Sequence, residues 1–121
     1  MAVWKIRQTV DLAKPLQQNV LKANMPHMMA GDKYAYDWII TVVDNGAYVD
    51  LTEYSASGSF YEENGDGMFQ GSVGEIKNNV CTIPLVNHTA PGPMRGVVKL
   101  TKGTTKLTIA VGEFYVHEGL G

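Results

Sequence analysis

The sequence predicts an all-β fold of the sandwich type, and three observations support this prediction. Runs rich in aromatic and β-branched residues recur about every ten residues, with clusters of Gly, Asn, Asp and Pro between them. The densest run, residues 33–43, places large apolar side chains at alternate positions. It is followed by Asn45-Gly46, and Asn-Gly tolerates the positive φ angles of a tight hairpin.

The first part of the chain predicts an extended segment followed by a loop. Residues 3–10 alternate apolar and polar side chains, and Pro15 interrupts the pattern because proline cannot sit in a central strand. Residues 1–15 are therefore expected to form an N-terminal strand or arm. The next run, 16–23, has apolar residues at helical spacing over a marginal length, and we interpret it as extended. Pro and Gly within 25–32 predict a loop or turn.

A hairpin is expected at the centre of the chain, formed by residues 33–43 and 47–52. Burial of a large apolar side chain contributes roughly 1.5–3 kcal/mol, so the face that carries Trp38 should enter the core. The residues that share this face are Tyr34, Tyr36, Trp38, Ile40 and Val42. The opposite face still carries Ile39 and Val43, and we expect a neighbouring chain to cover part of it.

The second half of the chain continues the same alternation of strands and turns. Strands are expected over 52–61, 68–74, 79–84, 96–101 and 106–117. Turns are expected at Glu62–Gly67, Asn78-Asn79 and Lys102-Gly103-Thr104. No repeat or linker composition divides the chain, so residues 1–121 are predicted to form a single β-sandwich domain.

Composition excludes several classes of protein. At 121 residues and 13.2 kDa the chain suits one domain with one core. The net charge is −2 and no basic run is present, so we expect no nucleic-acid partner. No signal-peptide core opens the sequence, and no run approaches the roughly 20 apolar residues that span a membrane, so a soluble protein without a membrane partner is expected. The charged fraction of 18% is below the usual share, which suggests contact with other subunits.

The sequence offers little catalytic chemistry. The lone Cys81 lies in a strand-like run and is interpreted as a buried, inert thiol. The three histidines lack neighbours at zinc-ligand spacing. The acidic segment 62–67 lacks the ligand pattern of an EF-hand, so a solvated turn is favoured and calcium binding is the alternative. We therefore expect no enzyme activity, no catalytic residue, no cofactor and no metal site.

Four residues are candidates for a binding surface. Ile39 and Val43 would form an interface with another chain, because they make one face of the central strand partly apolar on its non-core side. Trp4 and Tyr54 would be the aromatic residues to form a glycan platform, since sugars stack on exposed rings. For most of the other aromatic residues, core packing is the favoured explanation.

Several short blocks of the sequence carry a family resemblance. They are Thr9-Val10-Asp11-Leu12, Gly31-Asp32-Lys33-Tyr34, Val49-Asp50-Leu51-Thr52 after Asn45-Gly46, Gly96-Val97-Val98-Lys99-Leu100-Thr101, and Phe114-Tyr115-Val116. Together, from about Val3 to His117, they resemble the N-terminal domain of the baseplate upper protein of tailed phages and prophages of Gram-positive bacteria. The resemblance implies an immunoglobulin-like antiparallel β-sandwich that attaches receptor-binding machinery to the phage tail, without catalytic residues.

The resemblance also sets expectations for location and partners. It implies a virion structural protein, a baseplate or tail adaptor whose partners are other virion proteins. Larger family members continue into segments that organise trimers, whereas this sequence ends at Gly121, so a small adaptor or decoration subunit of tail or capsid is equally expected. Low charge and the apolar second face predict a homo-oligomer, for example a trimer. The alternative function is a carbohydrate-binding or adhesion module with the same fold class.

Overall fold

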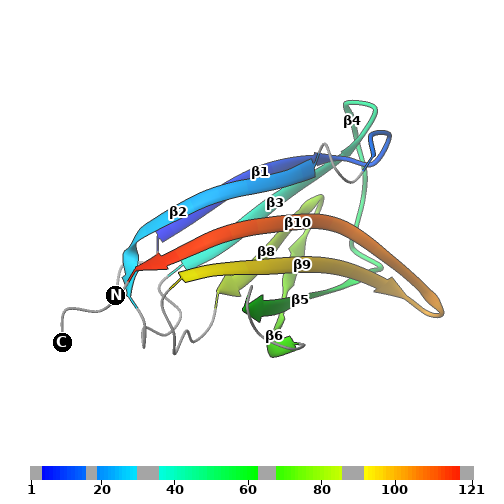
Figure 1. Cartoon of the computed structure of the whole chain (residues 1–121). Helices are drawn as coiled ribbons and strands as arrows, with labels where there is room; N and C mark the ends of the chain where they lie inside the picture. The colour runs from blue at the N-terminus through cyan, green and yellow to red at the C-terminus, as the bar shows by residue number, and fades with distance from the viewer. Residues whose placement is uncertain (1–3, 16–18, 30–35, 63–67, 86–91, 118–121) are drawn as a thin grey trace.

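Two mixed β-sheets pack face to face in the computed structural model, which describes residues 4–15, 19–29, 36–62, 68–85 and 92–117 (Figure 1). Strands make up nearly all of the described chain, and helices are absent from it. The strands are β1 (Trp4–Asp11), β2 (Val20–Met29), β3 (Tyr36–Asp44), β4 (Ala47–Tyr48), β5 (Ser55–Glu62), β6 (Met68–Val73), β7 (Glu75–Lys77), β8 (Val80–Leu85), β9 (Gly92–Lys102) and β10 (Thr105–His117). The predicted all-β sandwich is confirmed.

The strand order separates the chain into two five-stranded layers. The first sheet has the order β1-β3-β8-β7, with β4 paired to β3, and the second has the order β2-β10-β9-β5-β6. Most pairs are antiparallel as predicted, but β1 with β3 and β2 with β10 are parallel. A parallel pair needs a long crossover between its strands. For β1 and β3 that crossover is β2, which lies in the other sheet.

The N-terminal segment is a strand over its described length. Trp4 pairs with Tyr36 and Asp11 with Val43, so β1 matches β3 residue for residue. Residues 1–15 were expected to form either a strand or an arm, and residues 4–11 form a strand.

Three predicted turns are present as two-residue hairpin loops. Asn45 and Gly46 have φ angles of 50° and 80°, which is the conformation that Asn-Gly favours. Asn78 has a φ of 57° and connects β7 to β8, and Gly103 has a φ of 59° and connects β9 to β10. These positive angles explain why Asn and Gly occupy the tips of the hairpins.

Three segments differ from the sequence-based expectation. Residues 25–29 were expected in a loop but belong to β2, where Pro26 is tolerated because β2 is an edge strand and its register with β10 shifts beyond Met25. The expected strand 47–52 shortens to β4, because residues 49–54 leave the first sheet to reach β5. The short strand β7 was missed, since three residues show no periodicity. Expected features at 30–35 and 63–67 lie outside the described residues.

The core forms where the Trp38 face of β3 meets the second sheet. Tyr36, Trp38, Ile40 and Val42 are all buried, as their shared parity predicted. The indole of Trp38 meets the ring of Phe114 from β10 edge-to-face, with 5.1 Å between ring centroids. This contact joins interior strands of the two sheets, β3 and β10.

A network of hydrogen bonds lies where the chain passes from β1 to β2. These two strands run along the same side of the molecule (Figure 1). The Nε1 of Trp38 donates to Oε1 of Gln8 at 3.0 Å, and Nε2 of Gln8 donates to the carbonyl of Asn19. The buried Asn19 in turn donates from Nδ2 to the carbonyl of Asp11 and accepts from its N–H. Because Asn19 is buried, these bonds avoid the cost of unsatisfied polar groups.

Asp11 also links this corner to the hairpin between β3 and β4. Its Oδ1 accepts hydrogen bonds from the backbone N–H of Ala13 at 2.9 Å and of Asn45 at 2.8 Å. These donors favour the ionised carboxylate, so they hold the pKa of Asp11 below its ordinary value of 3.8.

The Asp11→Ala substitution is expected to destabilise the protein at neutral pH and to have a smaller effect in acid. Since the folded-state pKa is lowered, the stabilisation is full above the ordinary value and is lost as pH falls through the lower folded-state value. Urea unfolding of both proteins at pH 7 and at acidic pH measures this difference. Asp44→Ala, at an exposed site beside the same turn, is the control. If Asp11→Ala lowered the free energy of unfolding equally at both pH values, the charge of the Asp11 carboxylate would not be the source of the stabilisation.

Candidate functional site

Within the described part of the chain, the side chains show no cluster suited to metal binding and no unpaired buried polar atom. No helix among those residues is long and apolar enough to cross a membrane. The sequence-predicted candidates all lie on strands or in the segment before β5, so the surfaces of the two sheets are the features to consider.

Cys81 occupies the core side of β8 and is fully buried. Burial disfavours the thiolate and raises the pKa of Cys81 to about 11. Because the thiolate is the reactive form, both the burial and the pKa oppose nucleophilic chemistry.

We expect native Cys81 to react with Ellman's reagent far more slowly than the same thiol in urea-unfolded protein. The two rates, measured side by side at pH 8, check this expectation. Rapid stoichiometric labelling of the native protein would contradict the buried position.

Trp4 and Tyr54 do not share a surface. Trp4 begins β1 in the first sheet and is 48% exposed, whereas Tyr54 precedes β5 in the second sheet and packs against the core. β1 begins at the end of the sandwich where β10 finishes, while β5 begins nearer the β9–β10 hairpin (Figure 1). One glycan platform that used both rings would therefore have to span the length of the sandwich.

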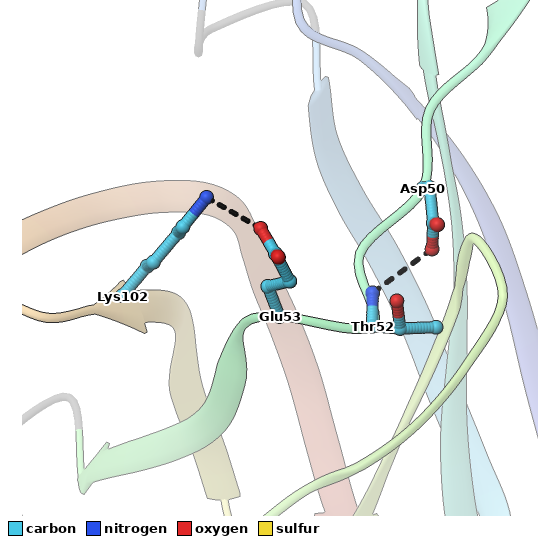
Figure 2. A network of polar contacts seen from close by, with 4 residues as sticks. All are labelled: Asp50, Thr52, Glu53 and Lys102. Atoms are coloured by element: carbon cyan, nitrogen blue, oxygen red, sulfur yellow. Dashed lines mark hydrogen bonds and ion pairs between the residues drawn. The ribbon is translucent and has the colours of Figure 1, made fainter.

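The segment around Tyr54 is anchored by an ion pair (Figure 2). Nζ of Lys102 lies 2.6 Å from Oε2 of Glu53 and 5.6 Å from the centre of the Tyr54 ring. Its hydrogen bond to Glu53 raises the pKa of Lys102. Asp50 closes the preceding turn by accepting from the N–H of Thr52 at 3.0 Å. Tyr54 thus lies between the Lys102 side chain and the core, which is a packing role.

Ile39 and Val43 lie together on the outer face of the first sheet. The buried residues of β3 alternate with half-buried ones, and Ile39, Thr41 and Val43 are all half-buried. Ile39 and Thr41 line a shallow depression with Arg7 and neighbouring residues of β1. The structure therefore unites these two candidates with each other and separates them from Trp4 and Tyr54.

Strand register orders this outer face into rows that cross the sheet. One row is Arg7, Ile39, Thr82 and Glu75, and the next row is Thr9, Thr41, Val80 and Lys77. Both rows have uncharged side chains on the central strands β3 and β8. Their formal charges lie on the outer strands β1 and β7. Tyr48 on β4 extends the apolar part beside Val43 and is 61% exposed.

The outer face of the second sheet carries a row that the sequence did not predict. Tyr61, Arg95, Glu113 and Lys22 are register partners across β5, β9, β10 and β2. The guanidinium of Arg95 lies 5.2 Å from the centre of the Tyr61 ring, and Lys22 lies 3.8 Å from Glu113. These residues are far apart in sequence, so only the strand order brings them together.

Comparison of the sequence with models of known protein families and with curated proteins gives no match. The resemblance described above therefore supports only a proposal about function. The fold and the surfaces of the two sheets supply the physical argument for that proposal.

Proposed function

We propose that this chain is a non-catalytic virion structural protein, a baseplate or tail adaptor subunit that acts through protein–protein assembly. In this proposal the sandwich is of the immunoglobulin-like type, its partners are copies of itself and other virion proteins, and it resides in the phage particle. The resemblance of the sequence to the baseplate upper protein family is one support.

The physical observation that carries the proposal is the outer face of the first sheet. The rows that contain Ile39, Thr41 and Val43 have uncharged side chains on β3, and their charged residues lie at the margins on β1 and β7. The same face of β3 also carries Asp37, near the start of the strand, where its register partner on β1 is Lys5. Protein interfaces have the same arrangement, with few charges at the centre and a polar rim. The extended face suits assembly better than it suits catalysis, which needs converging reactive groups.

Mass spectrometry of phage particles purified from the cells that produce this chain tests the proposal. We expect its peptides to copurify with intact particles through a density gradient, in constant ratio to the major virion proteins. Depletion of the peptides from the particle fraction while they remain in the cell lysate would contradict it.

A carbohydrate-binding module is the second candidate, and the outer face of the second sheet favours it. Tyr61 and Arg95 stack there, and Tyr115, on the same face of neighbouring β10, is 48% exposed. Calorimetric titration with cell-wall glycans would detect such binding. Saturable binding that Tyr115→Ala abolishes, in a chain that is absent from particles, would favour this candidate over the structural subunit.

A further inference from the structure

We propose that a second copy of this chain packs on the outer face of the first sheet, related by a two-fold axis that runs along the strands between β3 and β8. The inference rests on the proposed assembly function and specifies its partner and geometry. It is carried by the order of the charges across the sheet.

The side chains concerned all point away from the core. Ile39 and Thr41 alternate with buried β3 residues, and Thr82 alternates with buried residues of β8. On β7 the middle residue Ile76 packs against the core, so Glu75 on its flank points outward. Arg7 lines the outer depression with Ile39 and Thr41.

Within one row of the sheet, Arg7 and Glu75 have opposite charges and lie at opposite margins. The register order is Arg7, Ile39, Thr82, Glu75, so three strand spacings of 4.8 Å separate the two charged residues by about 14 Å. They are too far apart to pair within one chain. The ion pairs among the described residues are Lys22–Glu113 and Lys102–Glu53, and neither uses these two groups.

A two-fold axis along the strands exchanges the two margins. Because the axis passes midway between Ile39 and Thr82, it places Arg7 opposite Glu75 of the second copy and Glu75 opposite its Arg7. It also places Ile39 opposite Thr82, so the middle of this row stays free of charge. One operation therefore produces two ion pairs on either side of the uncharged middle of this row, which is the self-complementarity of an isologous interface.

The other two-fold arrangement of the same faces is disfavoured by charge. An axis perpendicular to the strands and centred on this row leaves each strand opposite its own copy. It then places Arg7 on Arg7 and Glu75 on Glu75, and like charges in contact oppose association. The charge order therefore selects the axis that runs along the strands.

The size of the face predicts a weak dimer. The strands β1, β3, β8 and β7 have 8, 9, 6 and 3 residues. At about 3.3 by 4.8 Å for each residue they make a patch of roughly 410 Å² per copy, compared with about 800 Å² in a standard interface. We therefore expect association at micromolar to millimolar concentrations. Such contacts suit an assembly in which many copies are held close together.

Sedimentation velocity of the full chain over this concentration range tests the inference with charge-reversal variants. The wild type is expected to form dimers, and R7E and E75R are each expected to weaken dimerisation about tenfold or more, because each reversal turns two attractions into two repulsions. The double variant R7E/E75R should restore the dissociation constant to near the wild-type value. The control K22E/E113K reverses an exposed ion pair on the second sheet. It should leave the dissociation constant of the dimer unchanged.

A wild type that stays monomeric over the whole range would overturn the inference, as would a double variant no better than either single one. Circular dichroism of each variant shows that the fold is retained, so loss of dimerisation is assigned to the face. A monomeric chain that is found in particles would refute this geometry alone. A chain that dimerises as expected but is absent from particles would refute the proposed function alone.

Discussion

Replacing Trp38 by alanine is expected to lower the free energy of unfolding by about 3–5 kcal/mol. Trp38 is the largest fully buried side chain, and its ring contacts Phe114 of the opposite sheet. Its loss would leave a cavity at the centre of the sandwich and remove the donor that satisfies Gln8. Because domains of this kind are stable by only about 5–15 kcal/mol, the variant would keep little margin.

Urea unfolding followed by circular dichroism measures this effect. Trp4→Ala is the matched control, since it removes the same side chain from a site that is 48% exposed, and its effect should be less than half as large. Trp38→Phe separates the two contributions, because it keeps an aromatic ring and removes the hydrogen bond to Gln8. Similar losses in the two alanine variants would contradict the central role of Trp38.

Gly112→Ala is expected to cost about 1–3 kcal/mol or more, although it adds only one methyl group. A Cβ at this position would lie 2.5 Å from the ring of Phe114 and 3.0 Å from Trp38. Both rings are buried and packed against each other, so neither can move without disturbing the core. The glycine thus leaves room for the ring of Phe114, on the same strand, and for Trp38 of the opposite sheet.

Gly71→Ala is the control for this prediction. Gly71 lies in β6 of the same sheet, where the nearest atom to an added Cβ is the carbonyl oxygen of Gly58, at the ordinary contact distance of 3.8 Å. Alanine there should be neutral or slightly stabilising, because it reduces the entropy of the unfolded chain. Thermal or urea unfolding of both variants makes the comparison. Equal stability of the two would show that the core tolerates a methyl group beside Phe114.

The sequence predicted part of the candidate site because part of it lies within one strand. Ile39 and Val43 both occupy odd-numbered positions of β3. The alternation of side chains along a strand alone places them on the same face, opposite Trp38. Trp4 and Tyr54 were candidates through residue type alone. Residue type does not specify a sheet or an end of the sandwich, and the structure places these two rings apart.

The boundaries of the strands and turns show the same difference between features that depend on local residues and features that depend on the whole sheet. Asn45-Gly46 could be located from the sequence, because the positive φ angles of a tight turn favour those residues locally. The strand conformation around Pro26 could not, because proline is tolerated there through the edge position of β2 and the register shift beyond Met25.

By itself, the sequence determined the all-β class, which side chains of β3 are buried, and the hairpin turns. Each of these depends on residues that are close together in the chain. The tertiary structure alone decided the two parallel pairings, the sheet to which each strand belongs, and the rows that cross the sheets. Arg7 and Glu75 belong to one row only because β3 and β8 lie between them. Register across several strands depends on long-range packing, which local preferences do not encode.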